Sequence, residues 1–301
     1  MSLRPHLACP LLAVILLAVL VPSAFARQGP PAPRPFADLT RIAEDVYAWR
    51  YQGYDTIFIV TDEGVIAADP SGITNPREPD LFKAVIRSVT DQPVRYLIYS
   101  HGNEDHAFGA DVFADTATLI ATQAAANKLA ALNSPRHPAP TLIVNDFLRL
   151  ELGGKAVDIH WAGQTQGDDY LIVHYPARRV LFAVDFIPVR TLLFRDLPGT
   201  TSIDAFIESL ARIERDLDFD VLGPGHGEFG TKDDVRAVRE YLQDLTAAVR
   251  AARARALADN SPEMVSAVRA DLAPRYSAWG QFEQWLPLNI SGVIRIWSAA
   301  Q

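Results

Sequence analysis

Two similar cycles of apolar strands and amphipathic helices follow one another along the chain. Runs of β-branched and aromatic residues between turn-forming residues predict strands, and apolar residues at helical spacing predict helices. The first cycle predicts strands at 46–50, 56–60, 65–68 and 94–99 and helices around 81–89 and at 122–132. The second predicts strands at 141–144, 156–161, 170–175, 180–184 and 221–222 and helices at 204–217, 233–258 and within 282–297, with Ser202 as a candidate N-cap. This order predicts an α/β protein with two sheets packed face to face and helices outside.

The first 26 residues have the pattern of an export signal. An apolar run from Leu11 to Val21 precedes the small residues Ala24 and Ala26, as a signal-peptidase site requires. The alternative is a membrane anchor, but the run is shorter than the roughly 20 residues that a span needs. We therefore expect an exported protein, periplasmic or secreted. The expected organisation is a signal peptide at 1–26, a flexible proline-rich lead-in at 27–40 and one domain with C-terminal helices at 41–301.

Composition narrows the classes of partner and of chemistry. The only cysteine, Cys9, lies in the segment expected to be removed, so the exported chain has no thiol for a disulfide, a nucleophile or a metal. A net charge of −8 without a basic run makes nucleic acid an unsuitable partner, because its binding depends on Lys and Arg. We also expect no stable membrane insertion after cleavage of the signal. A small-molecule substrate remains as the expected partner, and oligomeric state is left open.

Histidines and carboxylates gather where three predicted strands end. His101 and His106 enclose Gly-Asn-Glu-Asp directly after the strand at 94–99, Asp185 follows the strand at 180–184, and His226 follows the strand at 221–222. Such a set fits the nitrogen and oxygen ligands of zinc and similar metals. Taken alone, the His101–His106 segment is equally compatible with a polar turn that caps a helix.

These segments together resemble the metallo-β-lactamase superfamily. His101–His106 is similar to its HxHxDH signature, and residues 62–69 resemble its early strand that ends in aspartate. Residues 163–168 resemble its GHTxGD turn, Val184-Asp185 its bridging aspartate, and residues 223–227 its last ligand loop. The resemblance implies a four-layer αβ/βα sandwich, a metallo-β-lactamase-like domain at 41–301 and hydrolytic chemistry.

The resemblance also implies one intact metal site and one degenerate site. The positions of the second metal are Asp105, His106, His226 and the bridging Asp185. The three histidine positions of the first metal instead hold His101, Asn103 and Gln164. We therefore expect one bound ion, zinc by preference with manganese or iron as alternatives, and a doubtful second. His160 is a candidate replacement ligand, although a packed or surface histidine explains it more simply.

The implied function is hydrolysis of an ester, thioester, lactone or lactam by a metal-bound water. In this interpretation Asp105, Asp185 and His101 are the catalytic residues, with Asp185 orienting or deprotonating the water. His101 would act as a general base or polarise the scissile carbonyl, and Asn103 and Gln164 would donate hydrogen bonds to an oxyanion. The alternative is a non-catalytic exported protein that binds a metal or ligand and keeps the fold.

Overall fold

The computed structural model describes residues 38–71 and 75–300, which all belong to one of the two units of the chain, residues 35–301. The expected signal peptide and residues 27–37 of the expected lead-in lie outside the described residues. The first described strand begins at Asp38, three residues before the expected start of the domain at residue 41. Among the described residues, no helix combines the length and apolar character that a membrane-spanning segment requires.

The first sheet has seven strands in the order of the sequence. Its first four strands form an antiparallel meander, and parallel pairing then continues from β4 to β7. The parallel half therefore brings the carboxyl ends of successive strands to one edge. The strands are β1 (Asp38–Ala43), β2 (Val46–Tyr51), β3 (Tyr54–Val60), β4 (Val65–Ala68), β5 (Val94–Ile98), β6 (Thr118–Ala121) and β7 (Leu142–Ile143).

The second sheet has five strands in the order β12-β11-β10-β9-β8. Pairing is antiparallel from β8 to β11, and β12 returns parallel to β11 after a helical crossover. The loops after β11 and β12 therefore leave the same edge of this sheet. The strands are β8 (Phe147–Leu152), β9 (Lys155–Trp161), β10 (Leu171–Tyr175), β11 (Val180–Phe182) and β12 (Val221–Gly223).

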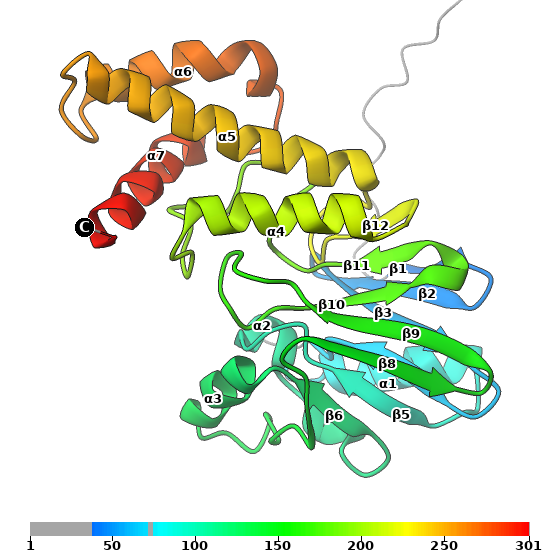
Figure 1. The fold of residues 1–301 in the computed structure, drawn as a ribbon. Coiled ribbons are helices and arrows are strands. Elements are labelled where there is room, and N and C mark those ends of the chain that lie inside the picture. The colour runs from blue at the N-terminus through cyan, green and yellow to red at the C-terminus, as the bar shows by residue number, and fades with distance from the viewer. Residues whose placement is uncertain (1–37, 72–74, 301) are drawn as a thin grey trace, which may run out of the picture. The chain divides into compact units, whose positions relative to one another are not determined.

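Helices cover the outer faces of both sheets. α4 and α5 run side by side over the second sheet, as Figure 1 shows, and α6 and α7 pack on α5. The first sheet is covered by α1, α3 and the short helix η1. The helices are α1 (Glu78–Val89), α2 (Glu104–Ala107), η1 (Ala110–Phe113), α3 (Gln123–Ala131), η2 (Pro176–Arg178), α4 (Ile203–Asp216), α5 (Lys232–Ala254), α6 (Pro262–Tyr276) and α7 (Phe282–Ala299).

Three apolar clusters hold these layers together. One lies between the sheets, for example Ile57 and Ile66 against Val157 and Phe182. A second joins the first sheet to α1 and η1, and the third joins the second sheet to α4–α7. Burial of one face of each element against the next produces the layered architecture. The expected four-layer αβ/βα sandwich is confirmed.

Local sequence sets where the main helices begin. The Ser202 side chain accepts a hydrogen bond from the Ala205 backbone N–H, which caps α4 as expected. Thr231 and Asp234 cap α5 reciprocally. The described elements that the apolar pattern did not predict are β1, β6, β8, α6 and the short helices α2, η1 and η2.

Candidate metal centre

The ligand positions come together because each follows the end of a strand. α2, which carries Asp105 and His106, lies shortly after β5, and Asp185 and His226 lie in the loops after β11 and β12. Asp185 adopts a left-handed backbone conformation with φ of 71°, which is uncommon for a residue other than glycine. The sheets thus bring together side chains that lie up to 121 residues apart in the sequence, from Asp105 to His226.

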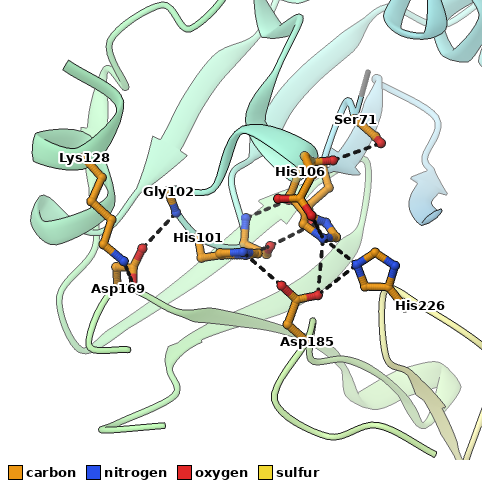
Figure 2. Close-up of polar contacts among 11 residues, drawn as sticks. Ser71, His101, Gly102, His106, Lys128, Asp169, Asp185 and His226 are labelled. Carbon is orange, nitrogen blue, oxygen red and sulfur yellow. Dashed lines mark hydrogen bonds and ion pairs between the residues drawn. The ribbon is translucent and has the colours of Figure 1, made fainter. Parts of the chain in front are cut away.

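Asp185 lies at the centre of the three histidines, as Figure 2 shows. Its Oδ1 is 3.3 Å from Nε2 of His106 and 3.2 Å from Nε2 of His226. Its Oδ2 is 3.2 Å from Nε2 of His101. Asp105 extends the group, with its Oδ2 3.7 Å from Nε2 of His106. The structure therefore brings the four positions of the intact site and His101 into one cluster.

Hydrogen bonds on the far side of two rings fix which nitrogen faces the cluster. Nδ1 of His106 is 3.1 Å from a carboxylate oxygen of Asp69, and Nδ1 of His226 is 3.1 Å from the backbone carbonyl of Gly53. Both partners only accept hydrogen bonds, so both Nδ1 atoms donate. Each neutral ring then presents the lone pair of Nε2, and these two Nε2 atoms are 3.0 Å apart. Two lone pairs at this distance repel unless a proton or a metal ion lies beside them.

The donor set fits a divalent metal ion. Nε2 of His101 and Oδ1 of Asp185 are buried and have no hydrogen-bond partner among the described residues, although charged neighbours are close. Two overlapping sets place their ligand atoms within 4.8 Å of one another, namely His101, His106 and Asp185, and Asp105, His106 and His226. Imidazole nitrogen and carboxylate oxygen suit zinc, manganese or iron. Carboxylate or carbonyl partners on the outer nitrogens are typical of histidines that bind metal.

The buried histidines and carboxylates of the cluster shift one another's pKa values. Burial alone would lower the pKa of His106, but the carboxylates of Asp185 and Asp69 raise it well above its ordinary value. Burial would raise the pKa of Asp185, but His106 and His101 hold it well below its ordinary range. Asp185 is therefore an anion at neutral pH. His106 holds a proton where a metal ion would otherwise neutralise the carboxylates.

The two amide side chains of the degenerate site point to different surroundings. Asn103 occupies the N-cap position of α2, is exposed and makes no capping hydrogen bond with its side chain. It lines the cavity beside Asp105. Oε1 of Gln164 instead accepts a hydrogen bond from Thr201 Oγ1 at 3.1 Å, and Gln164 is not among the residues that line the cavity.

His160 lies in a different part of the second sheet. It forms a group with Asp158 and His174, and its ring packs beside Phe147 with centroids 5.0 Å apart. Both oxygens of Asp158 already accept from Arg149, and Nε2 of His174 donates to the Asp218 carbonyl at 2.9 Å. His160 therefore does not replace a missing ligand of the first metal.

Several residues around the site were not identified from the sequence. Tyr170 stacks on His101 with centroids 4.4 Å apart, and burial raises its pKa well above the ordinary value. Buried Asp169 accepts hydrogen bonds from the Gly102 N–H at 2.9 Å and from Lys128 Nζ at 2.6 Å, which holds the His101 loop against α3. The only sequence signal for Asp169 is its position just before an apolar strand.

A cavity of about 660 Å³ opens over the cluster. Asp105, Asp185 and His226 line it, together with Tyr54. Cavities of 300–1,000 Å³ are the usual size for small-molecule sites. The ligand cluster is therefore accessible to a molecule of that size.

Comparisons with known proteins agree with this geometry. The family model described as the metallo-beta-lactamase superfamily matches residues 56–226, which include every ligand position. None of the curated proteins compared with the chain matches it in sequence.

Two solved structures illustrate the likeness in fold. A metallo-beta-lactamase from Pontibacter korlensis superposes with a TM-score of 0.59 at 20% identity, covering 69% of this chain and 99% of its own. The DIM-1 metallo-beta-lactamase superposes with a TM-score of 0.60 at 15% identity, covering 69% of this chain and 98% of its own. The family match spans more than half of the chain, and this protein belongs to the metallo-beta-lactamase superfamily.

Proposed function

We propose that the protein is a metal-dependent hydrolase that acts on a small-molecule ester, thioester, lactone or lactam. The observation that carries the proposal is the cluster of Asp105, His106, Asp185 and His226 beside a cavity that three of them line. Membership of the superfamily supports hydrolase-like chemistry. The superfamily also contains non-hydrolytic members, so the bond and the substrate rest on this proposal.

Asp105, His106 and His226 would hold the ion, with Asp185 as a fourth ligand. A bound zinc-like ion supplies a Lewis acid and lowers the pKa of water to about 7. Asp185, an anion at neutral pH, accepts a proton from the attacking water at a carboxylate oxygen. Nε2 of His101, 3.2 Å from Oδ2, is placed to hold that proton and return it to the leaving group.

The remaining residues orient these groups. Ser100 Oγ lies 2.9 Å from Nδ1 of His101, and Tyr170 stacks on the same ring, so its position is fixed from two sides. Asn103 lines the cavity and can donate a hydrogen bond to a developing oxyanion. Gln164 is bonded to Thr201, and the proposal gives it no part in the reaction.

The test compares Asp185→Asn with the full chain, each loaded with zinc, manganese or iron, on a panel of esters, thioesters, lactones and lactams. We expect kcat/KM to fall about 100-fold or more, because removal of a general base typically costs that much. Asp168→Asn is the matched control, since Asp168 is exposed on a nearby loop. Metal content is measured in all samples. Equal turnover by Asp185→Asn with bound metal would contradict the mechanism.

A non-catalytic binding protein is the second candidate. It is favoured by the amides at Asn103 and Gln164, which stand where the family has histidines. Stoichiometric metal binding without turnover of any panel substrate would support it. Complete loss of turnover on removal of the metal, with recovery on its return, would exclude it.

The proposal includes export of the protein, and zinc is the preferred ion among zinc, manganese and iron. Residues 1–26 support export through their apolar run and small residues before the expected cleavage point. The test is expression of the full chain followed by mass spectrometry of the exported fraction. A mature N-terminus at Arg27 is the expected result, and an uncleaved chain inside the cell would contradict it.

A further inference from the structure

The cavity has an apolar part (the apolar wall), formed mostly by a loop inside the segment that matches the family model and completed by one residue beyond it. The loop at residues 188–199 supplies most of it, and α7 closes it with Trp285. Because the family match ends at residue 226, α7 is a feature of this chain beyond that match. The apolar lining residues are Pro188, Val189, Leu192, Phe194, Pro198 and Trp285.

This wall is held in place by backbone contacts between the loop and the start of α7. The Leu192 N–H donates to the Gly280 carbonyl at 3.0 Å, and the Gly280 N–H donates to the Arg190 carbonyl at 2.8 Å. Buried Asn289 donates from Nδ2 to the carbonyls of Leu193 and Arg195 at 2.8 and 2.5 Å. The loop is therefore anchored both to the segment just before α7 and to α7 itself.

The backbone of the loop is costly to form. Arg190, Arg195 and Leu197 have φ values of 47°, 47° and 57°, although none is glycine. The left-handed region is unfavourable for such residues and persists only where surrounding contacts hold it. The anchors to α7 thus maintain a specific shape of this wall.

Phe194 and Trp285 form an aromatic pair on the wall. Their ring centroids are 5.3 Å apart at 87°, and Phe194 is 41% exposed. An exposed phenylalanine beside a metal cluster leaves apolar surface in water, which an apolar ligand would cover. The Arg195 guanidinium lies over the Phe194 ring, 5.0 Å from its centroid, so the apolar contact surface is the part of the pair that Arg195 does not cover.

The cavity also has polar lining residues. Asn103 and Lys128 line it, together with Gln166, whose Oε1 is buried without a hydrogen-bond partner among the described residues. Lys128 is neutralised by Asp169 at 2.6 Å, so these residues offer hydrogen bonds more than net charge. The cavity therefore combines apolar and polar lining residues beside a single reactive cluster.

We propose that the substrate carries a medium-length acyl or aryl group that packs on Phe194 and Trp285 while its scissile carbonyl lies at Asp185. This inference rests on the proposed hydrolytic function and names the substrate class for the same site. The apolar group is recognised by the wall and the polar remainder by Asn103 and Gln166. The preference for an apolar group thus depends on the C-terminal helix.

The test separates binding from turnover. Octanoyl hydroxamate and acetohydroxamate share a metal-chelating head and differ by six methylenes, and each buried methylene is worth about fourfold in affinity. With about half of the added chain buried, isothermal titration calorimetry of the metal-loaded full chain should show octanoyl hydroxamate binding about 10- to 100-fold more tightly. In Trp285→Ala, and separately in Phe194→Ala, the ratio should fall at least about fivefold.

Leu288→Ala is the matched control, because Leu288 is exposed on the same helix and does not line the cavity. It should keep the wild-type ratio. Equal affinity for the two hydroxamates, binding of neither, or an unchanged ratio in both cavity variants would overturn the inference.

The same samples are assayed with p-nitrophenyl octanoate and p-nitrophenyl acetate. A chain-length ratio in binding without hydrolysis of these esters or of any substrate in the ester, thioester, lactone and lactam panel would retain the apolar subsite and refute the hydrolase proposal. Hydrolysis of both esters with equal kcat/KM, and equal affinity for the hydroxamates, would retain the hydrolase and refute the apolar subsite.

Discussion

Asp69 is expected to control both the stability of the fold and the state of the metal ligand His106. It is buried at the end of β4, where its two oxygens accept from the Ser100 N–H at 2.8 Å, the Ser100 hydroxyl at 2.7 Å and His106 Nδ1 at 3.1 Å. Asp69→Asn keeps the size of the side chain but replaces one acceptor oxygen by an NH2 group. At least one present donor then faces another donor.

The magnitude follows from these contacts. A hydrogen bond to a charged group contributes about 1.5–3 kcal/mol, so the loss of one such bond should lower the free energy of unfolding of the metal-free protein by about that amount. If the NH2 group faces His106, Nδ1 must accept, and the proton moves to Nε2, which is the atom that faces the metal position. Metal affinity should then fall about 10- to 100-fold, as for other partners of metal-binding histidines.

Chemical denaturation of the metal-free protein and metal titration against a chelator measure the two effects. Asp62→Asn is the control, because Asp62 is exposed in the turn before β4. Metal affinity within twofold of the unaltered protein, together with an unchanged free energy of unfolding, would refute the role assigned to Asp69.

Three further outcomes follow from the site and its supports. Because carboxylates raise the pKa of His106, metal uptake must displace its proton, and the affinity for the metal should increase from pH 6 to pH 8. Chelator competition that shows no pH dependence would contradict this. Asn289→Leu removes the partner of the Tyr241 hydroxyl and of two loop carbonyls, so the free energy of unfolding should fall by about 3 kcal/mol, measured by denaturation. Gly225→Ala should lower the free energy of unfolding by about 1–2 kcal/mol and weaken metal binding, because φ at this position is 79° and a Cβ would lie 2.6 Å from Val184 Cγ1. An unchanged thermal unfolding transition would contradict the geometry.

The layered fold was predictable because its signals are local. Apolar runs such as Val65–Ala68 and the helical spacing after Ser202 coincide with β4 and α4. β8 was missed, although Phe147–Leu152 alternates, because three of its six residues are exposed and weaken the apolar run. α6 was missed because its apolar residues do not gather clearly on one face of the helix.

The candidate site was predictable only as a set of ligand types. The sequence placed His106, Asp185 and His226 after strand ends, but it did not contain the 3.0–3.3 Å distances that result from the meeting of two sheets. The position of the Gln164 side chain also depends on a contact with Thr201, 37 residues away in the sequence. The apolar wall depends on Trp285, which reaches the cavity only because α7 folds back onto the loop at 188–199.

Metal content per chain tests the central claim most directly. Elemental analysis of purified protein supplied with zinc, manganese or iron should give one tightly bound equivalent. That equivalent should be lost in His226→Ala and retained in His101→Ala. Two equivalents, no bound metal, or loss in His101→Ala with retention in His226→Ala would contradict a single site formed by Asp105, His106, Asp185 and His226.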